Sequence, residues 1–514
     1  MPSRSRTRAW IGTTTIAAHG VGEIQRVANR IVPGVAGESG KLVFLFLVRN
    51  RAPGHRRPET GATDPLTIAP VDFDLAGRLE DLAADERWIF RPWTSREYSH
   101  GLFQYPAMMV PQMQRELLEC LRLESSADSV CDSFVGSGTT MAESMLQGLD
   151  FVGVDVNPLA VLLCRAKRGP FFIQALEEAA GRVTERAAAD TGRTIEIDWK
   201  GWRKWFRQDV AVGLSRLRRA IRRERVLSTR RFMWVALAET VRLSSNSRTS
   251  TVKLHVRPPE DRSRRINVLG AFEQILEQNL DRFEDQRQAL ADKGFLAHGH
   301  YTGRVKIELK DISTAASDSA TAAPCQILLT SPPYGDNATT VPYGQHAFLP
   351  LQWIDLADID PDADERFLVS THAIDSMSLG APTRGALDQV EPLRAISPAL
   401  DDTLGRLEEL PRDRPARVAA FWRDLDSSLA NVLAGLDQGA LMAWTVGNRR
   451  VGGDEVPMDA ILRELLEHRG STFVTTLARE IPDCRKRMAS RNSIAATMTA
   501  EQVLVLRAGV DRND

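Results

Sequence analysis

The amino-acid sequence predicts an α/β fold, in which a doubly wound, mostly parallel seven-stranded sheet carries a mainly helical insertion. Residues 130–155 have the pattern of strand, glycine turn, helix and strand, which is the βαβ unit of parallel sheets. Strand patterns return at residues 305–309 and 326–329, after a long helical stretch. Three more strand patterns follow, at residues 440–446, 472–477 and 502–506. The last two can pair as an antiparallel hairpin.

The composition is that of a globular protein with two or three domains, or one domain with a large insertion. The chain has 514 residues, of which 43% are hydrophobic and 26% charged. The five cysteines are scattered without a CxxC pair, which argues against a zinc site or a disulfide framework and favours a reducing cytoplasm. The apolar run at residues 42–48 is too short to span a membrane, and threonines interrupt the N-terminal apolar stretch, so export is not expected.

Charge is distributed unevenly along the chain, although the formal net charge is only -1. Residues 1–60 carry a net +7 and residues 200–257 a net +13, whereas residues 355–409 carry a net -9. Two basic blocks in a nearly neutral chain indicate a polyanionic partner.

The patterns divide the chain into four predicted parts. Residues 1–85 form an N-terminal extension of unknown role, with a strand candidate at 41–49 and a linker at 53–65. The other parts are a cofactor-binding half at 86–168, a helical basic insertion at 169–300, and a catalytic half at 301–514 with an acidic loop region near 355–415. A helix is expected over residues 106–123, ahead of the first strand.

The glycine turn Asp132-x-Phe134-x-Gly136-x-Gly138-Thr139-Thr140 follows a strand and opens a helix. Glycines allow the backbone to approach a ligand closely, although many purely structural turns also contain a GxG. The spacing is neither that of a dinucleotide fingerprint nor that of a phosphate loop. Asp155 ends the second strand, where a carboxylate can bind both ribose hydroxyls, and Asp311 can accept from an adenine amino group. These features describe a nucleoside with a carboxylate-bearing tail, which is S-adenosylmethionine.

The turn Ser331-Pro332-Pro333-Tyr334 follows an apolar strand. Two prolines stiffen it and remove two backbone donors, so carbonyl groups are left free. A hydroxyl, a rigid carbonyl and a flat ring together form a clamp for a planar group that bears an amine. An ordinary Pro-Pro turn is the structural alternative, and it would place this clamp beside the cofactor motifs only by coincidence.

Together these motifs resemble those of the amino-methylating DNA methyltransferases, which methylate the exocyclic amino group of cytosine (N4) or adenine (N6). Residues 99–108 are similar to the family segment that covers the methionine end of the cofactor. The resemblance covers residues 90–165 and 300–350, and more weakly 438–508. It implies the class I S-adenosylmethionine-dependent methyltransferase fold, double-stranded DNA as the substrate and no metal. A cognate restriction nuclease of a restriction-modification system, or another defence protein, is a candidate partner that the sequence leaves open.

The resemblance also implies roles for individual residues. The expected cofactor-binding residues are His100, Tyr105, Pro106, Asp132, Phe134, Gly136, Gly138, Thr139, Thr140, Asp155, Asn157 and Asp311. The expected catalytic residues are Ser331, Pro332, Pro333 and Tyr334. Ser331 and the Pro332 carbonyl would accept hydrogen bonds from the target amine, and Tyr334 would stack on the flipped base, so that the methyl group moves by direct displacement. Serine at the first position favours cytosine, whereas asparagine or aspartate there favours adenine.

The insertion combines arginines with aromatic residues and is the expected site of target recognition. The candidate DNA-binding residues are Arg216, Arg219, Arg223, Arg242, Asn246 and Arg248. Removal of arginines from residues 216–225 should then weaken DNA binding and flatten its salt dependence. A solvated basic helix face is the alternative. Gly447-Asn448-Arg449-Arg450 and the basic segment at 485–492 are either flanks of a DNA cleft or charged loops.

Two motifs are weighed and set aside. Pro324-Cys325-Gln326 resembles the nucleophile motif of enzymes that methylate ring carbon five of cytosine, but Cys325 begins its strand and is expected to be a buried apolar residue. Glu308-Leu309-Lys310 resembles part of a nuclease metal site, without an acidic partner upstream.

Three alternatives to a cytosine-N4 enzyme stay open. These are an adenine-N6 methyltransferase, an RNA base methyltransferase and a DNA-binding relative without activity. The sequence does not predict the recognition site or the oligomeric state.

Overall fold

The computed structural model describes residues 75–90, 96–314, 324–336, 340–481 and 498–509. The chain divides into two units, residues 1–70 and 71–514, and all described residues belong to the second. The strand expected at residues 41–49, the linker at 53–65 and the basic segment at 485–492 lie outside the described residues. None of the described helices is both long and apolar enough to cross a lipid bilayer.

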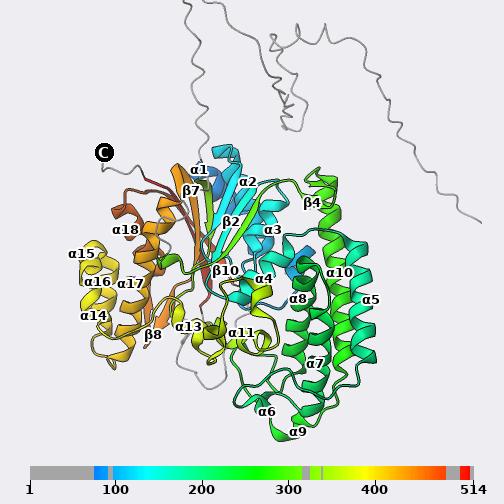
Figure 1. Ribbon diagram of the computed structural model, residues 1–514. Helices are drawn as coiled ribbons and strands as arrows, with labels where there is room; N and C mark the ends of the chain where they lie inside the picture. Colours follow the sequence, from blue (N-terminus) through cyan, green and yellow to red (C-terminus); the bar gives the residue numbers. More distant parts are fainter. Residues whose placement is uncertain (1–74, 91–95, 315–323, 337–339, 482–497, 510–514) are drawn as a thin grey trace, which may run out of the picture. The chain divides into compact units, whose positions relative to one another are not determined.

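A sheet of seven strands organises the second unit, in the order β10-β11-β7-β6-β1-β2-β5 (Figure 1). The strands are β1 (Ser129–Asp132), β2 (Asp150–Asp155), β5 (Val305–Leu309), β6 (Cys325–Thr330), β7 (Leu436–Val446), β10 (Thr472–Glu480) and β11 (Ala500–Arg507). β11 is antiparallel to both of its neighbours, and the other pairs are parallel. The seven predicted strands and the antiparallel hairpin are therefore confirmed.

The order of the strands places the two predicted motifs together. From β1 the chain moves outward through β2 to β5, and it then returns to β6 on the other side of β1. Ligands of doubly wound sheets bind beyond the carboxyl ends of the strands at such a reversal. The glycine turn follows β1 and the Ser-Pro-Pro-Tyr turn follows β6, so both motifs lie at this point of the sheet.

Helices cover both faces of the sheet. One layer contains α1 (Leu75–Ala84), α2 (Pro111–Ser125), α3 (Thr139–Met145) and α4 (Pro158–Lys167), and the opposite layer contains α17 (Asp413–Ala434) and α18 (Met458–His468). Successive strand residues point to opposite faces. Accordingly, Ile327 and Leu329 of β6 pack in the first layer and Leu328 packs in the second.

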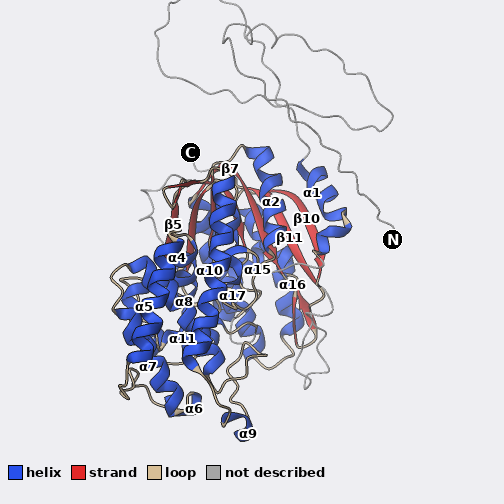
Figure 2. Ribbon diagram, turned by 90° about the vertical axis from the view of Figure 1, so that its right-hand side faces the viewer, coloured by secondary structure: helices blue, strands red, loops and turns tan. Residues whose placement is uncertain are grey.

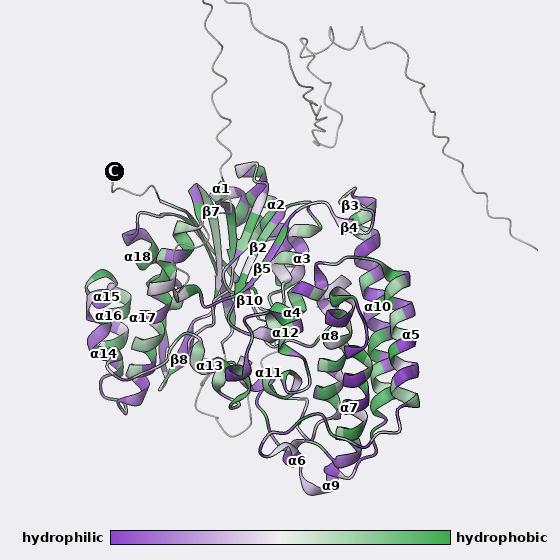
Figure 3. Ribbon diagram, viewed as in Figure 1, coloured by the Kyte–Doolittle hydropathy of each residue, from purple (hydrophilic) through white to green (hydrophobic). Residues whose placement is uncertain are grey.

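The insertion between β2 and β5 is mainly helical, as predicted. Its elements are α5 (Ile173–Ala189), α6 (Trp202–Trp205), α7 (Gln208–Arg222), α8 (Leu227–Ser244), α9 (Pro259–Arg262), α10 (Val268–Asp292) and the hairpin of β3 (Leu296–Ala297) and β4 (His300–Tyr301). The long helices have polar and apolar faces (Figure 3), and the apolar side of α8 is buried against α4. This packing makes the insertion continuous with the first layer.

Helix α1, which lies within the predicted N-terminal extension, belongs to the same unit as the sheet. Leu75 and Leu79 are buried in the first layer, and Thr475 of β10 donates a 3.1 Å hydrogen bond to Glu80. Figure 2 shows α1 beside β10, and α2 packs against α1. The described part of residues 1–85 therefore covers the end of the sheet.

The acidic region consists of short helices, and it lies against the basic insertion. These helices are α11 (Tyr343–Leu351), α12 (Leu356–Ile359), η5 (Glu365–Leu368), α13 (Ala373–Met377), α14 (Ala386–Gln389), α15 (Glu391–Ile396) and α16 (Pro398–Leu407). Asp355 pairs with Arg218 at 2.7 Å and with Arg222 at 2.8 Å, and Asp358 pairs with Arg230 at 2.7 Å. Part of the +13 charge is thus neutralised within the chain, so it is a weaker indication of a polyanionic partner than it is in the sequence alone.

Candidate active site

A cavity of about 610 Å³ lies at the carboxyl edge of the sheet, where β1 and β6 end. It has the size of a typical small-molecule site, roughly 300–1,000 Å³. Eleven of the sixteen residues predicted to bind the cofactor or to catalyse line it, namely Tyr105, Phe134, Gly136, Thr139, Asp155, Asn157, Asp311, Ser331, Pro332, Pro333 and Tyr334. One cavity therefore joins the glycine turn to the Ser-Pro-Pro-Tyr turn.

The glycine turn has a backbone that requires glycine. Gly136 and Gly138 have φ values of 48° and 76°, in the left-handed region. A β-carbon on Gly138 would lie 2.8 Å from the Cys164 sulfur, whereas Gly136 faces the cavity. Gly138 thus packs the turn against α4, and it does not itself line the cavity. Gly136 brings the backbone up to the ligand space.

Asp155 ends β2 with its carboxylate at the cavity wall. Its two oxygens accept hydrogen bonds from the backbone N–H groups of Gly136 and Asn157, both at 2.8 Å. Burial raises its pKa to about 6, and these hydrogen bonds oppose that effect. An ionised carboxylate has about four acceptor positions, so Asp155 can also accept from a hydroxyl group in the cavity.

Asp132 lies behind the cavity and does not line it. One of its oxygens accepts hydrogen bonds from the Thr330 hydroxyl at 2.6 Å and the Phe134 N–H at 3.0 Å, and the other is buried without a partner. Burial raises the pKa of Asp132 to about 6. Thr140 is buried as well, and its hydroxyl donates to the Leu329 carbonyl at 3.1 Å. These two predicted cofactor residues tie the glycine turn to β6.

The aromatic ring of the Ser-Pro-Pro-Tyr turn is held from two sides. The Tyr334 hydroxyl donates a 3.3 Å hydrogen bond to Glu501 of β11, and Glu501 forms an ion pair with the buried Arg479. A β-carbon on Gly447 would lie 2.7 Å from the ring of Tyr334. Burial raises the pKa of Tyr334 well above its usual value, so the hydroxyl is neutral at physiological pH. The ring therefore has little freedom before a substrate binds.

In the segment of residues 99–108, the residues that line the cavity come from the second half. Tyr105 stacks on Tyr343 with ring centroids 5.8 Å apart, and its hydroxyl accepts a 3.2 Å hydrogen bond from Asn157. His100 lies elsewhere: it is fully buried, 2.9 Å from Glu143, and burial lowers its pKa. His100 and Pro106 do not line the cavity. His100 anchors the segment through Glu143, and its contact with the cofactor stays a prediction.

Several cavity residues were not among the predicted site residues. Tyr343, Met377 and Met498 come from segments without a motif, so no signal in the sequence marks them. Arg449 and Arg450 also line the cavity, and their motif was predicted to be either a flank of a DNA cleft or a charged loop. Arg449 donates a 3.0 Å hydrogen bond to the buried Asp336, two residues beyond Tyr334. This bond joins the loop after β7 to the catalytic turn.

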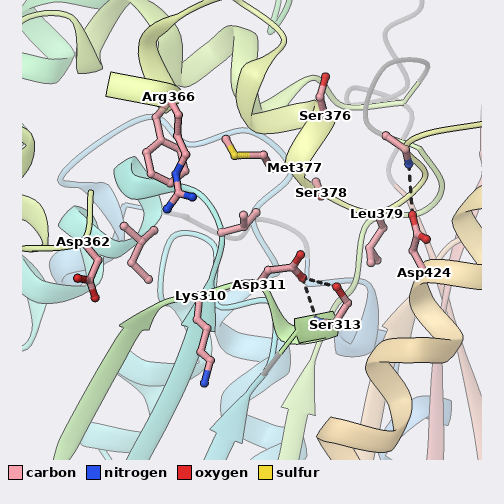
Figure 4. Close-up of a pocket in the computed structure, with 14 residues that line it drawn as sticks. Lys310, Asp311, Ser313, Asp362, Arg366, Ser376, Met377, Ser378, Leu379 and Asp424 are labelled. Atoms are coloured by element: carbon pink, nitrogen blue, oxygen red, sulfur yellow. Dashed lines mark hydrogen bonds between the residues drawn. The ribbon is translucent and has the colours of Figure 1, made fainter. Parts of the chain in front are cut away.

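A second cavity of about 590 Å³ adjoins the first on the side of Asp311 (Figure 4). Asp311 accepts hydrogen bonds from the N–H and the hydroxyl of Ser313, at 2.9 and 2.8 Å. Asp311, Met377 and Leu379 line both cavities. Asp311 therefore lies where the two cavities meet, at the end of the ligand space farthest along the sheet from Ser331.

The residues predicted to bind DNA fall into two groups. The first group is engaged by other residues of the chain. Arg219 pairs with Asp190 at 2.8 Å, and Arg242 bonds to Glu239 and Gln104. Arg216 donates to the Gly192 carbonyl, and Asn246 is buried. Their first role is structural, and DNA contact by them stays a prediction. Arg223 and Arg248 are exposed, and no described residue bonds to their guanidinium groups.

Cys325 is buried at the first position of β6, away from the carboxyl edge, as predicted. It does not line the cavity. Glu308 pairs with Lys306 on the same strand at 2.8 Å. Neither residue is placed for the chemistry of the motif that it resembles.

Comparisons with known proteins point to one family. A model of N6 and N4 methyltransferases, described as DNA methylase, matches residues 75–164. The Type II methyltransferase M.MvaI of Kocuria varians is 28% identical over 440 residues, which cover 82% of this chain and 93% of that protein. The Type II methyltransferase M.MjaII of Methanocaldococcus jannaschii is 31% identical over 108 residues, 21% of this chain and 18% of that protein.

Among solved structures, the rRNA methyltransferase aviRa of Streptomyces viridochromogenes has a TM-score of 0.25 and 12% identity, over 79% of this chain and 86% of that chain. So low a score supports no inference. The sheet order itself is that of the class I methyltransferase fold. The family match spans α1 to α4 and includes the glycine turn, and the similarity to M.MvaI extends over both halves of the chain. These similarities support an amino-methylating DNA methyltransferase.

Proposed function

We propose that this protein transfers a methyl group from S-adenosylmethionine to the N4 amino group of cytosine in double-stranded DNA. The observation that carries the proposal is the position of Ser331, which lines the same cavity as Asp155 and Gly136. A hydroxyl that can accept from an amine thus shares one space with a carboxylate that can bind a ribose. The proposal includes flipping of the base, because an amino group inside a duplex cannot reach this cavity.

The cavity residues fit the cofactor. Asp155 would bind the ribose hydroxyls, Asp311 would accept from the adenine amino group, and the backbone at Gly136 would leave room for the methionine end. When bound, S-adenosylmethionine supplies an electrophilic methyl group on a sulfonium. Asn157 keeps Tyr105 in place through the bond between their side chains, so the ring can cover the ligand.

The catalytic turn orients the target amine. No described residue donates a hydrogen bond to the Pro332 carbonyl, which leaves that oxygen free to accept from the amine. Ser331 supplies the second acceptor. Two fixed acceptors draw the nitrogen toward tetrahedral geometry, so that its lone pair can point at the methyl group. The ring of Tyr334 would support the base by stacking.

The choice of cytosine rests on Ser331 as the first residue of the turn. Adenine-N6 is the alternative on the same fold, and the identity of the modified nucleoside separates the two. DNA as the substrate implies a cytoplasmic enzyme. A restriction nuclease is the natural partner of a Type II methyltransferase, as in a restriction-modification system, and we propose it on the names of the two relatives alone.

A transfer assay tests the proposal. The full chain is incubated with methyl-labelled S-adenosylmethionine and either duplex DNA of mixed sequence or total RNA. Label should enter DNA with the natural enzyme and be lost with Ser331→Ala. The matched variant Ser427→Ala, which removes an exposed hydroxyl that does not line the cavity, should still transfer. Label in RNA alone, or full transfer by Ser331→Ala, would contradict the proposal.

A further inference from the structure

The paired arginines of the insertion leave a smaller basic surface than the sequence indicates. Arg218, Arg219, Arg222 and Arg230 of α7 and α8 each pair with a carboxylate of the same chain. If one of these arginines left its carboxylate to bind a phosphate, the carboxylate would lose its counter-charge. These arginines are therefore poor candidates for phosphate contacts. A surface for DNA must therefore be sought among cations without such partners.

These cations gather at one end of the insertion, which we call the insertion tip and define as residues 198–209 and 246–265. The tip contains ten basic residues and four acidic ones. Its two segments are joined by hydrogen bonds from the Asn246 N–H to the Trp205 carbonyl and from Arg207 to the Arg264 carbonyl, both at 2.7 Å. Figure 1 shows α6 and α9 together at this end. The tip is thus one connected surface.

Several of its charges are exposed and available. No described residue forms a hydrogen bond or ion pair with the side chains of Lys200, Arg248, Lys253 or Arg265, which are all exposed. Arg203 and Lys204 lie over the rings of Trp202 and Trp205, at 4.5 and 4.8 Å from the ring centroids. Both tryptophans are buried, so they present these two cations on a rigid base. By contrast, Arg207 pairs with Asp209 at 2.8 Å.

The tip is connected directly to the wall of the active-site cavity. The Leu254 N–H donates a 3.2 Å hydrogen bond to Gln345 of α11, and Tyr343, the first residue of that helix, lines the cavity. Gln345 lies two residues from Tyr343, within one helical turn, so Leu254 of the tip lies beside the wall of the cavity.

We propose that the insertion tip binds the phosphates of the DNA that flanks the target base, through Lys200, Arg203, Lys204, Arg248, Lys253 and Arg265. The inference rests on the proposed function, because it takes duplex DNA as the substrate. DNA carries about one charge per 1.7 Å of helix axis, and exposed cations on one connected surface can neutralise several of its phosphates. This assignment places DNA contact near the N-terminal end of α7, whereas the arginines predicted to bind DNA lie toward its C-terminal end. The 15 residues of α7 make the helix about 22 Å long.

Binding titrations at several salt concentrations test the inference. The double variant Arg248→Ala/Lys253→Ala removes two tip charges. The matched control Arg193→Ala/Arg225→Ala removes two exposed and unpaired charges of the insertion outside the tip. The plot of log K against log salt has a negative slope, to which each phosphate contact contributes about 0.9 in magnitude. The tip variant should reduce the magnitude of this slope by about 2, and the control should keep the natural slope. Both should keep the natural melting temperature.

The outcomes separate this inference from the proposed function. The inference would be overturned if the tip variant kept the salt dependence of the natural protein, or if the control lost that dependence. Either result would count even if the enzyme methylates DNA. Absence of methylated nucleosides, together with DNA binding that depends on the tip, would overturn the proposed function and leave the inference standing. With methylation intact, the tip variant should raise the KM for DNA at 150 mM salt and change kcat by less than about twofold, because its charges are remote from the reacting atoms.

Discussion

The Thr330 hydroxyl donates a 2.6 Å hydrogen bond to Asp132, and this bond links the ends of β6 and β1. Each strand leads directly into a functional turn, so the bond sets the spacing between the cofactor site and the catalytic turn. Both side chains are buried, and the second oxygen of Asp132 has no partner. The carboxylate therefore depends on the few donors that it has.

Thr330→Val should destabilise the protein by about 1–3 kcal/mol, because it removes a donor from a buried carboxylate while it keeps the size of the side chain. Thr330→Ser restores the hydroxyl and should recover most of that loss. The free energy of unfolding, measured with urea, checks both variants. Equal stability of the valine and serine variants would show that the bond does not hold the two strands.

Cofactor affinity should depend on pH through Asp155. Its pKa of about 6 in the folded protein means that the carboxylate is ionised above pH 6 and protonated below it. Protonation removes an acceptor for the ribose, so the Kd for S-adenosylmethionine should be constant from pH 7 to 8 and should rise below pH 6. Calorimetric titration measures this, and Asp155→Asn should bind weakly without that pH dependence.

Loss of folding does not mimic this effect. An unfolded aspartate has a pKa of about 3.9, so between pH 4 and pH 6 the folded chain binds more protons at this position than the unfolded chain. The contribution of Asp155 to stability therefore falls as pH rises through this range, in the opposite direction to cofactor affinity. An affinity that is unchanged between pH 5 and pH 7 would contradict the role of Asp155.

Tyr334 should act mainly through its ring. Tyr334→Phe keeps the ring and removes one hydrogen bond to Glu501, so kcat should fall by about tenfold or less, as a neutral hydrogen bond contributes about 0.5–1.5 kcal/mol. Tyr334→Ala removes the stacking surface, which contributes about 1–3 kcal/mol per base, and should cost more. Single-turnover methylation rates give the comparison. A phenylalanine variant as impaired as the alanine variant would assign the main role to the hydroxyl.

Asp358 should be a structural anchor of the basic insertion. It accepts two 2.7 Å bonds from Arg230 and a 2.8 Å bond from the Trp234 ring N–H, and it is 9% exposed. Asp358→Ala leaves Arg230 without its carboxylate and should cost about 3–5 kcal/mol. The exposed Glu467, which pairs with Arg463 at 3.1 Å, is the control, and Glu467→Ala should cost less than about 1 kcal/mol. Thermal melting of both variants measures the two losses of stability. Equal losses would show that Asp358 contributes no more than a surface ion pair.

Local signals predicted the sheet and both turns. The run Ile327, Leu328 and Leu329 is apolar on both faces, because helices cover each side of β6, and such a run is recognisable without its neighbours. The turn residues are constrained by their own backbone, as the positive φ values of Gly136 and Gly138 show. These features depend on a few adjacent residues, and they were predicted with the correct order along the chain.

Pairings between distant residues were not predictable in the same way. His100 belongs to the expected cofactor segment, but its place is decided by Glu143, 43 residues away. Arg218 meets Asp355 across 137 residues, and only the fold shows that one predicted charge block neutralises part of another. A sequence gives the positions of charged residues but not their ion-pair partners. The surface proposed to bind DNA therefore differs from the predicted one.

The identity of the methylated nucleoside tests the central claim most directly. Duplex DNA methylated by the full chain is digested to nucleosides and analysed by mass spectrometry beside synthetic standards. The position of Ser331 at the first residue of the turn predicts N4-methylcytosine, and Ser331→Ala should abolish it. N6-methyladenine as the product would contradict the assignment of the base, and the absence of any methylated nucleoside would contradict the account as a whole.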